Sequence, residues 1–237
     1  EVIVNARLDG PLSSRATLTT DGGGFYDLPD ELPEFPEPPD FDLEGYGAAQ
    51  RYLLEVWCEK STMNDVLEPL CSRYGANLQT GVGELSITKT LELVVQRIGA
   101  AGKPCRIFYV SDFDPAGKSM PVAVARQIEY WLRTQHPDLD VKLQPIVLTE
   151  DQVRQYRLPR TPIKDTESRK AKFEERFGEG ATELDALEAL FPGELERIVS
   201  EALDVYFDDE LADRVEEAKE ELQDELDQIR DDVVSDH

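Results

Sequence analysis

Two patterns of apolar and polar positions alternate through the middle of the chain. Short apolar or β-prone runs bounded by turn residues predict strands, and apolar residues recurring every three or four positions predict helices. The predicted strands cover residues 52–58, 76–80, 105–111 and 141–148. The predicted helices cover residues 61–74, 86–102 and 119–135. This alternation predicts an α/β fold, a parallel-sheet Rossmann-type core with flanking helices.

Residues at the ends of these elements sharpen the prediction. Ser61 is suited to cap the first helix, and a glycine stop follows the second. We expect Ser119 to cap the third helix, with Pro121 in its first turn. Pro145 cannot donate a ladder hydrogen bond, so the last strand is expected at an edge of the sheet or near its own end.

Composition divides the chain into five parts. They are residues 1–26, 27–49, 50–150, 151–207 and 208–237. The pattern leaves the first part unassigned, whereas the prolines and acids of the second predict an extended linker. The third holds the α/β core, and the fourth a basic loop and helices that break at Pro192 and Gly193. The last is predicted to be a long acidic amphipathic helix that docks a partner, pairs with a second copy or packs on its own domain.

Charge is distributed unevenly. The chain has 25 basic and 50 acidic residues, a net charge of −25 that on its own disfavours binding to nucleic acid. However, residues 1–50 carry net −9 and residues 201–237 net −13, whereas residues 51–200 carry only −3. Within the middle, residues 154–176 have a net charge of +4. This basic segment is a candidate to follow a DNA backbone, and a solvated loop is the alternative.

Residues suited to other chemistries are scarce. The three cysteines, Cys58, Cys71 and Cys105, form no CxxC pair, which favours reduced thiols and a cytoplasmic protein. With only His136 and His237, a histidine-based metal site or catalytic triad has little material. No apolar run is long enough to cross a membrane. Chemistry in this chain is therefore expected to use carboxylates, hydroxyls and the backbone.

Three carboxylates follow two of the predicted strands. Asp112 and Asp114 come directly after the run 105–111, and Glu59 follows 52–58. Ligands of open α/β sheets bind outside the carboxyl ends of the strands, so these acids converge if the two strands are neighbours. Clustered acids repel each other unless a cation neutralises them, and an oxygen-only ligand set favours Mg²⁺ or Mn²⁺. An ordinary turn and helix start is the alternative for the two aspartates.

The segments "VWCEKSTMND", "GVGELSITKT" and "IFYVSDFDPAGKSM" resemble the Toprim domain, the metal-binding fold of topoisomerases, primases and certain nucleases. The Toprim pattern is a glutamate after the first strand and an Asp-x-Asp after a later one. Within this family, the three segments are similar in particular to the A subunit of topoisomerase VI and its meiotic double-strand-break relatives. The resemblance covers about residues 50–150 and extends more loosely to residue 200.

The resemblance implies roles for individual residues. Glu59, Asp112 and Asp114 would bind Mg²⁺, with Glu59 alternatively acting as a general acid–base. Glu183 and Asp185 are candidates for a second metal or its surroundings, or simply surface acids. Lys60 and Lys118 are candidates to contact phosphate, or are ordinary solvated lysines. Independently of the resemblance, the basic segment adds candidate DNA contacts at Arg160, Lys164, Arg169, Lys170 and Lys172. The glycines expected to allow close backbone approach or tight turns are Gly81, Gly83 and Gly117.

The resemblance also has a gap. A topoisomerase VI A subunit carries a winged-helix domain with a nucleophilic tyrosine, and Tyr26 and Tyr46 lack that context. The chain begins at Glu1 rather than Met, so we expect it to be part of a longer protein. Three functions stay open: Mg²⁺-dependent cleavage of DNA as a nuclease or topoisomerase-like subunit, a non-catalytic interaction module in a DNA-processing complex, and RNA processing or priming.

Overall fold

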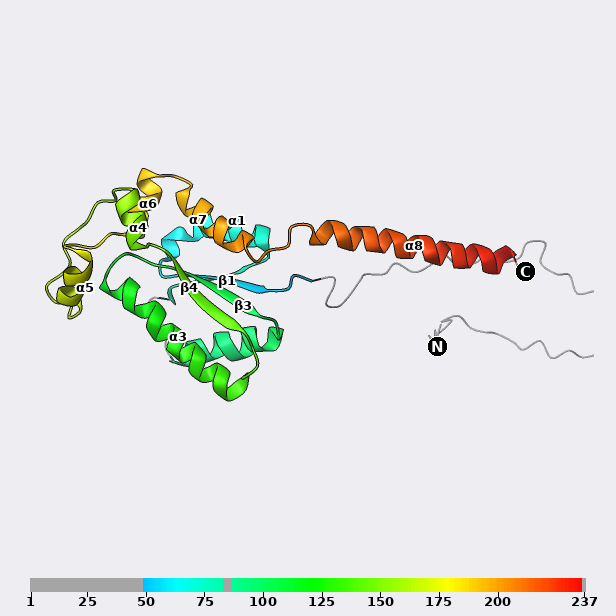
Figure 1. Cartoon of the computed structure of the whole chain (residues 1–237), viewed down its shortest axis with the longest axis horizontal. Coiled ribbons are helices and arrows are strands. Elements are labelled where there is room, and N and C mark those ends of the chain that lie inside the picture. The colour runs from blue at the N-terminus through cyan, green and yellow to red at the C-terminus, as the bar shows by residue number, and fades with distance from the viewer. Residues whose placement is uncertain (1–48, 83–86, 236–237) are drawn as a thin grey trace, which may run out of the picture. The chain divides into compact units, whose positions relative to one another are not determined.

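A four-stranded, all-parallel sheet forms the centre of the computed structural model, which describes residues 49–82 and 87–235 (Figure 1). The strands are β1 (Leu53–Cys58), β2 (Asn77–Thr80), β3 (Cys105–Val110) and β4 (Val141–Val147). Their order is β2-β1-β3-β4, and β1 pairs with β3 over its whole length. The predicted α/β class with a parallel sheet is therefore confirmed. The segment 1–26, all but the last residue of the linker 27–49, and Gly83 lie outside the described residues.

The order of the strands follows from their residues. β1 and β3 are buried almost throughout, as two central strands of a covered sheet require. β4 lies at the edge, where the missing N–H of Pro145 costs no hydrogen bond inside the sheet, and this prediction is confirmed.

Helices connect the strands and extend beyond them. A 3₁₀ turn, Ser61–Met63, leads into the first α-helix, and a π-helical stretch, Glu92–Gly99, continues the second. The α-helices that follow the strands are α1 (Asn64–Tyr74), α2 (Ile87–Leu91), α3 (Pro115–Gln135) and α4 (Glu150–Gln155). The later ones are α5 (Lys170–Phe177), α6 (Leu184–Leu190), α7 (Glu194–Asp204) and α8 (Leu211–Ser235). Gly193, with φ +85°, separates α6 from α7, so the predicted break is confirmed.

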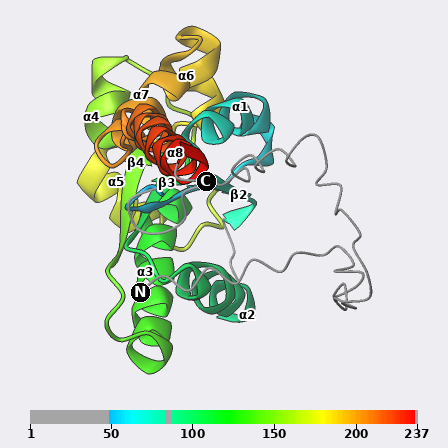
Figure 2. The same cartoon turned by 90° about the vertical axis from the view of Figure 1, so that its right-hand side faces the viewer.

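The alternation of side chains along each strand divides the core in two. Leu54 and Val56 of β1 pack with apolar residues of α1, α6 and α7, whereas Trp57 packs with the π-helical stretch and α3. Figure 2 shows α1, α6 and α7 on one side of the sheet and α2 and α3 on the other. Both faces are therefore covered, and the strand ends are where a site can open.

Helix α3 begins four residues before the predicted cap. Asp114 is its N-cap, because its carboxylate accepts a hydrogen bond from the Gly117 N–H at 2.6 Å, and Pro115 opens the first turn. The expectation that Ser119 caps the helix, with Pro121 in its first turn, is wrong. The Ser119 hydroxyl bonds back to the Pro115 carbonyl at 2.9 Å from inside the helix. Pro121 is tolerated there because the carbonyl of Gly117, which it cannot reach by a hydrogen bond, accepts one from the Ser111 hydroxyl instead.

The chain divides into two compact units. The larger, Phe41–Asp224, contains the sheet and both predicted parts 50–150 and 151–207. The smaller contributes residues 225–235 of α8 to the description. None of the described residues of α8 is buried, and its docking or pairing stays a prediction. Within the described ranges, no helix has the length and apolar character needed to cross a membrane.

Candidate metal centre

The three predicted carboxylates follow the carboxyl ends of the two central strands, β1 and β3. The last residues of β1 and β3, Cys58 and Val110, are partners in the ladder, and the Glu59 N–H donates to the Val110 carbonyl at 2.9 Å. The condition set by the sequence, that the two strands are neighbours, is therefore met. Glu59 leaves β1 and Asp112 leaves β3 side by side.

A short antiparallel bridge fixes the Asp-x-Asp segment. The N–H of Phe113 donates to the Thr182 carbonyl at 2.9 Å, and the Thr182 N–H donates back at 3.0 Å. Between the aspartates, Phe113 is fully buried against Phe173 and Phe177. Because side chains alternate along extended backbone, burying the middle one turns both aspartates away from this core.

Each aspartate is held by a backbone donor. Asp112 is 7% exposed, and its Oδ1 accepts from the Leu184 N–H at 2.7 Å. Asp114 is bound to the N–H of Gly117 as the cap of α3. Burial raises the pKa of Asp112, although the bond from Leu184 and the charge of Lys60 act in the opposite direction. Both carboxylates are thus oriented by the fold rather than left to rotate in solvent.

Glu59 is the least satisfied acid of the group. Its Oε2 is buried and accepts no hydrogen bond from any described residue. Burial, followed by the nearby charges of Asp114 and Asp112, raises the pKa of Glu59 to about 7. The charge of Lys60 acts in the opposite direction, but among the described residues its ion pairs are with Asp112, Glu183 and Asp185 and not with Glu59.

Lys60 supplies a cation on the other side of the cluster. Its Nζ lies 3.2 Å from Asp112 Oδ1 and 2.7 Å from Asp185 Oδ2, and it also pairs with Glu183. Burial opposes the charge, but the hydrogen bonds to Asp185 and Glu183 outweigh it and raise the pKa of Lys60. The two acids predicted as second-metal candidates therefore do lie at the site, where they bind a lysine.

The donor set fits a divalent cation held partly through water. In residues 49–82 and 87–235, no three His, Cys, Asp or Glu side chains are spaced to hold a metal ion together. Mg²⁺, however, usually keeps several waters and takes only one or two carboxylates. The partnerless oxygen of Glu59, crowded by Asp112 and Asp114, is the position that such a cation would neutralise.

A cavity opens beside these residues. Its volume is about 250 Å³, and its lining includes Asp114, Glu183 and Lys164. The predicted phosphate contact Lys164 is exposed and stands at this cavity. Of the three predicted metal carboxylates, only Asp114 lines this cavity.

The predicted glycines have different surroundings. A Cβ at Gly117 would lie 2.1 Å from the Asp112 carbonyl oxygen, so the turn at the site requires glycine. Gly81 has φ +72°, and a Cβ added there would have no other atom within 4 Å. Only its backbone conformation favours glycine, as in a plain turn after β2.

Several predicted DNA contacts are occupied by the protein itself. Arg160 donates to the carbonyls of Phe177, Gly178 and Gly180 and so ties the loop to the end of α5. Lys170 pairs with Asp165, and Arg169 with Glu167. Lys118 donates to the Leu148 carbonyl at 3.2 Å. Lys172 is exposed.

Sequence reasoning missed two contributors to the site. One is the Leu184 N–H that orients Asp112, which no side-chain pattern could indicate. The other is the aromatic cluster of Phe113, Phe173 and Phe177, for which the i,i+4 spacing of the last two on a helix was an available signal.

No protein-family model matches this chain, and no curated protein matches its sequence. The geometry of the carboxylates and the resemblance in their flanking segments are therefore what a functional proposal can use.

Proposed function

We propose that this chain is a Mg²⁺- or Mn²⁺-dependent enzyme, or the catalytic part of one, that cleaves phosphodiester bonds of DNA. The observation that carries the proposal is the buried, partnerless oxygen of Glu59 beside Asp112 and Asp114. These acids lie at the carboxyl edge of two adjacent parallel strands, where ligands of Rossmann-like sheets bind. The similarity to the Toprim pattern supports the same proposal.

Each carboxylate has a defined part in this proposal. Glu59, Asp112 and Asp114 would hold the metal ion, which when bound polarises the scissile phosphate and stabilises the leaving oxygen. The Leu184 and Gly117 N–H groups keep Asp112 and Asp114 in place for that task. Glu59 is alternatively the group that accepts or donates the proton, because burial and its acidic neighbours raise its pKa to about 7.

Lys60 and Lys164 would bind the substrate. Lys60 already neutralises Asp112, and its two exposed partners, Glu183 and Asp185, can release it to a phosphate oxygen. Lys164 lies at the adjoining cavity and would contact the next phosphate. A net charge of only −3 over residues 51–200 permits this approach of DNA.

Two other functions remain as outcomes of the test. A non-catalytic interaction module has no physical need for Glu59 to be buried without a donor, which makes it the weaker candidate. RNA processing would use the same carboxylates, with RNA instead of DNA as the substrate.

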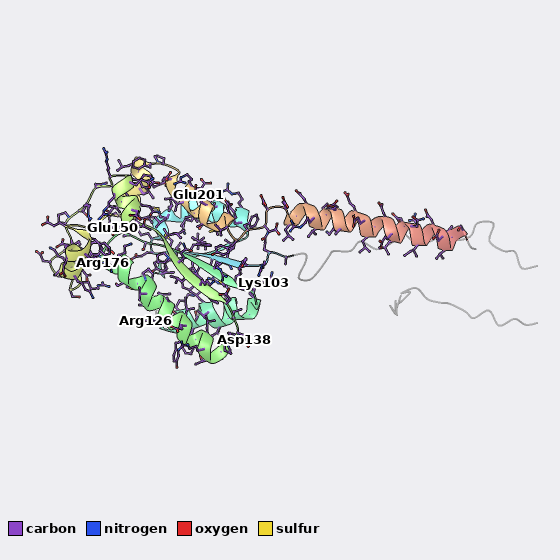
Figure 3. The ribbon with its side chains drawn as sticks, viewed as in Figure 1. Lys103, Arg126, Asp138, Glu150, Arg176 and Glu201 are labelled. Carbon is purple, nitrogen blue, oxygen red and sulfur yellow. The ribbon has the colours of Figure 1, made fainter. Side chains whose placement is uncertain are left out.

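The proposal is tested by converting supercoiled plasmid to nicked or linear form with Mg²⁺ or Mn²⁺. Asp112→Asn keeps an acceptor for the Leu184 N–H but removes the charge, and we expect cutting to be lost. Asp138→Asn makes the same change at an exposed site near the start of β4, away from the carboxyl ends of the strands (Figure 3), and should cut like the wild type.

Three results separate the candidate functions. No cutting by the wild type, together with no metal-induced rise in its melting temperature, would contradict the proposal and leave the interaction module. Faster cutting of an RNA of the same sequence would favour RNA processing. Equal cutting by Asp112→Asn and wild type would show that other residues carry the activity.

A further inference from the structure

A second hollow lies between the start of α3 and helix α5. Its volume is about 280 Å³, and it shares only Pro115 with the cavity beside the carboxylates. Four of its lining side chains are cationic and none is acidic. They are Lys118, Arg169, Lys172 and Arg176. In a chain with twice as many acids as bases, this basic–aromatic pocket is an exception to the general charge.

Most of this positive charge is not neutralised by the protein. Arg169 pairs with Glu167 and bonds to the Ser119 hydroxyl. Among the described residues, however, no ion pair joins Lys118, Lys172 or Arg176 to a carboxylate. Burial and the charge of Arg176 lower the pKa of Lys118, against an opposing attraction from Glu150. The pocket therefore presents cations whose mutual repulsion an anionic ligand would reduce.

The same pocket has an aromatic surface. Phe173 and Phe177, four residues apart on α5, have ring centroids 5.0 Å apart, and Phe173 is 5% exposed. Phe177 is only half-buried, and the guanidinium of Arg176 lies 5.0 Å from its ring centroid. Aromatic and guanidinium planes next to cations are the combination on which nucleic-acid bases stack in single strands.

We propose that this pocket binds one unpaired nucleotide of a DNA strand, its phosphate at the cations and its base against Phe177. The proposal rests on the proposed function, because Pro115 follows the site carboxylate Asp114 and joins the pocket to the carboxylate cavity. A strand cut at the carboxylates would have its neighbouring nucleotide here. The enzyme would then prefer single-stranded or frayed DNA to closed duplex, since a paired base cannot reach the pocket.

The experiment measures binding of a fluorescent 15-nucleotide single strand by anisotropy, with the whole chain in EDTA. The pocket variant is Lys172→Ala with Arg176→Ala. The matched control is Lys142→Ala with Arg126→Ala, which removes the same two charges from exposed positions. Figure 3 shows Arg176 by α5 and Arg126 along α3, at well-separated places.

The expected result is about tenfold weaker binding by the pocket variant, with a smaller salt dependence, and little loss in the control. Phe177→Leu, which keeps an apolar side chain, should weaken single-strand binding without changing the salt dependence. Wild type should bind a duplex of equal length more weakly than the single strand. dAMP should compete better than pyrophosphate, because only the former has a base.

Several outcomes would overturn the inference. Equal losses of affinity in the pocket and control variants would show non-specific electrostatic attraction. Equal affinity for duplex and single strand would show that binding does not need an unpaired base. Pyrophosphate competing as well as dAMP would mean a simple phosphate site. Since binding is measured without metal, it can fail while Asp112→Asn still abolishes cutting, and it can succeed when no cutting occurs.

Discussion

Two glutamates from the same strand region have opposite surroundings. Glu55, inside β1, is fully buried, and donors reach both of its oxygens. Trp57 Nε1 donates at 2.9 Å, Asn77 Nδ2 donates at 3.0 Å, and Arg97 forms an ion pair with it. Glu59, one residue past the strand, is less buried but has an oxygen without any described donor.

Hydrogen-bond satisfaction, rather than depth of burial, separates the two residues. Burial raises the pKa of Glu55, and Trp57 and Arg97 oppose that rise. Burial also raises the pKa of Glu59, but there Asp114 and Asp112 add to the rise. Since a fold gains nothing from a buried acid without a donor, Glu55 has the surroundings of a structural carboxylate, and Glu59 is the one that we propose binds a ligand.

Replacing Glu59 should produce the largest difference between the two positions. Glu59→Gln removes the charge on which either metal binding or proton transfer depends. We expect plasmid cutting to fall by about 100-fold or more. The free energy of unfolding should stay the same or rise, because repulsion from Asp112 and Asp114 disappears. Cutting and chemical denaturation of the same preparation check both parts, and a loss of stability with unchanged cutting would reverse the assignment.

Breaking the pair at Glu55 should have the opposite signature. Arg97→Ala leaves a fully buried carboxylate with two neutral donors, and we expect the free energy of unfolding to fall by about 2–3 kcal/mol. At temperatures where the variant is folded, cutting should be unchanged. Arg133→Ala removes an exposed i,i+4 partner of Glu129 and should change stability little. Urea denaturation measures both, and equal losses would show that burial of Glu55 adds nothing.

The sequence was sufficient for the sheet and its edge but not for the state of the site. Strand and helix patterns predict the parallel sheet, and the carboxyl-end rule brings Glu59 and Asp112 together once β1 and β3 are neighbours. The start of α3 was misplaced because Ser119 and Asp114 are both good caps. Pro115, directly after Asp114, is a local signal for the earlier start, and the bridge from Phe113 to Thr182 holds the backbone just before it.

The partners of the charged groups could not be predicted, because they come from distant parts of the chain. Glu183, the N-cap of α6, and Asp185, in its first turn, reach Lys60 from a segment more than 120 positions along the chain. Arg97 reaches Glu55 from a π-helical stretch whose phase the helical pattern does not give. Pairing of this kind depends on packing, which periodicity does not encode.

A substitution at Gly117 disturbs the site without removing a carboxylate. In Gly117→Ala, the new Cβ would overlap the Asp112 carbonyl oxygen at 2.1 Å, and the backbone has to move. We expect a loss of about 1–2 kcal/mol in the free energy of unfolding together with reduced cutting. Ala123→Ser, at an exposed position of the same helix, is the control. Wild-type cutting by a destabilised Gly117→Ala would show that the position of Asp112 is not critical.

The smallest expected effect is on the pH dependence of stability. Burial raises the pKa of Glu55 in the folded chain above its ordinary value of 4.5. Between 4.5 and the folded-state pKa, the folded chain therefore binds more protons than the unfolded chain. The free energy of unfolding should therefore fall as pH rises from about 4.5 through the folded-state pKa. Glu55→Gln cannot titrate and should show a shallower fall, measured by urea denaturation at half-unit pH steps. Glu129→Gln supplies the matched control on exposed surface. A steeper fall in Glu55→Gln would mean that the donors around this carboxylate outweigh its burial, and Glu55 would then hold its charge in the core as firmly as Asp140 does beside Arg106.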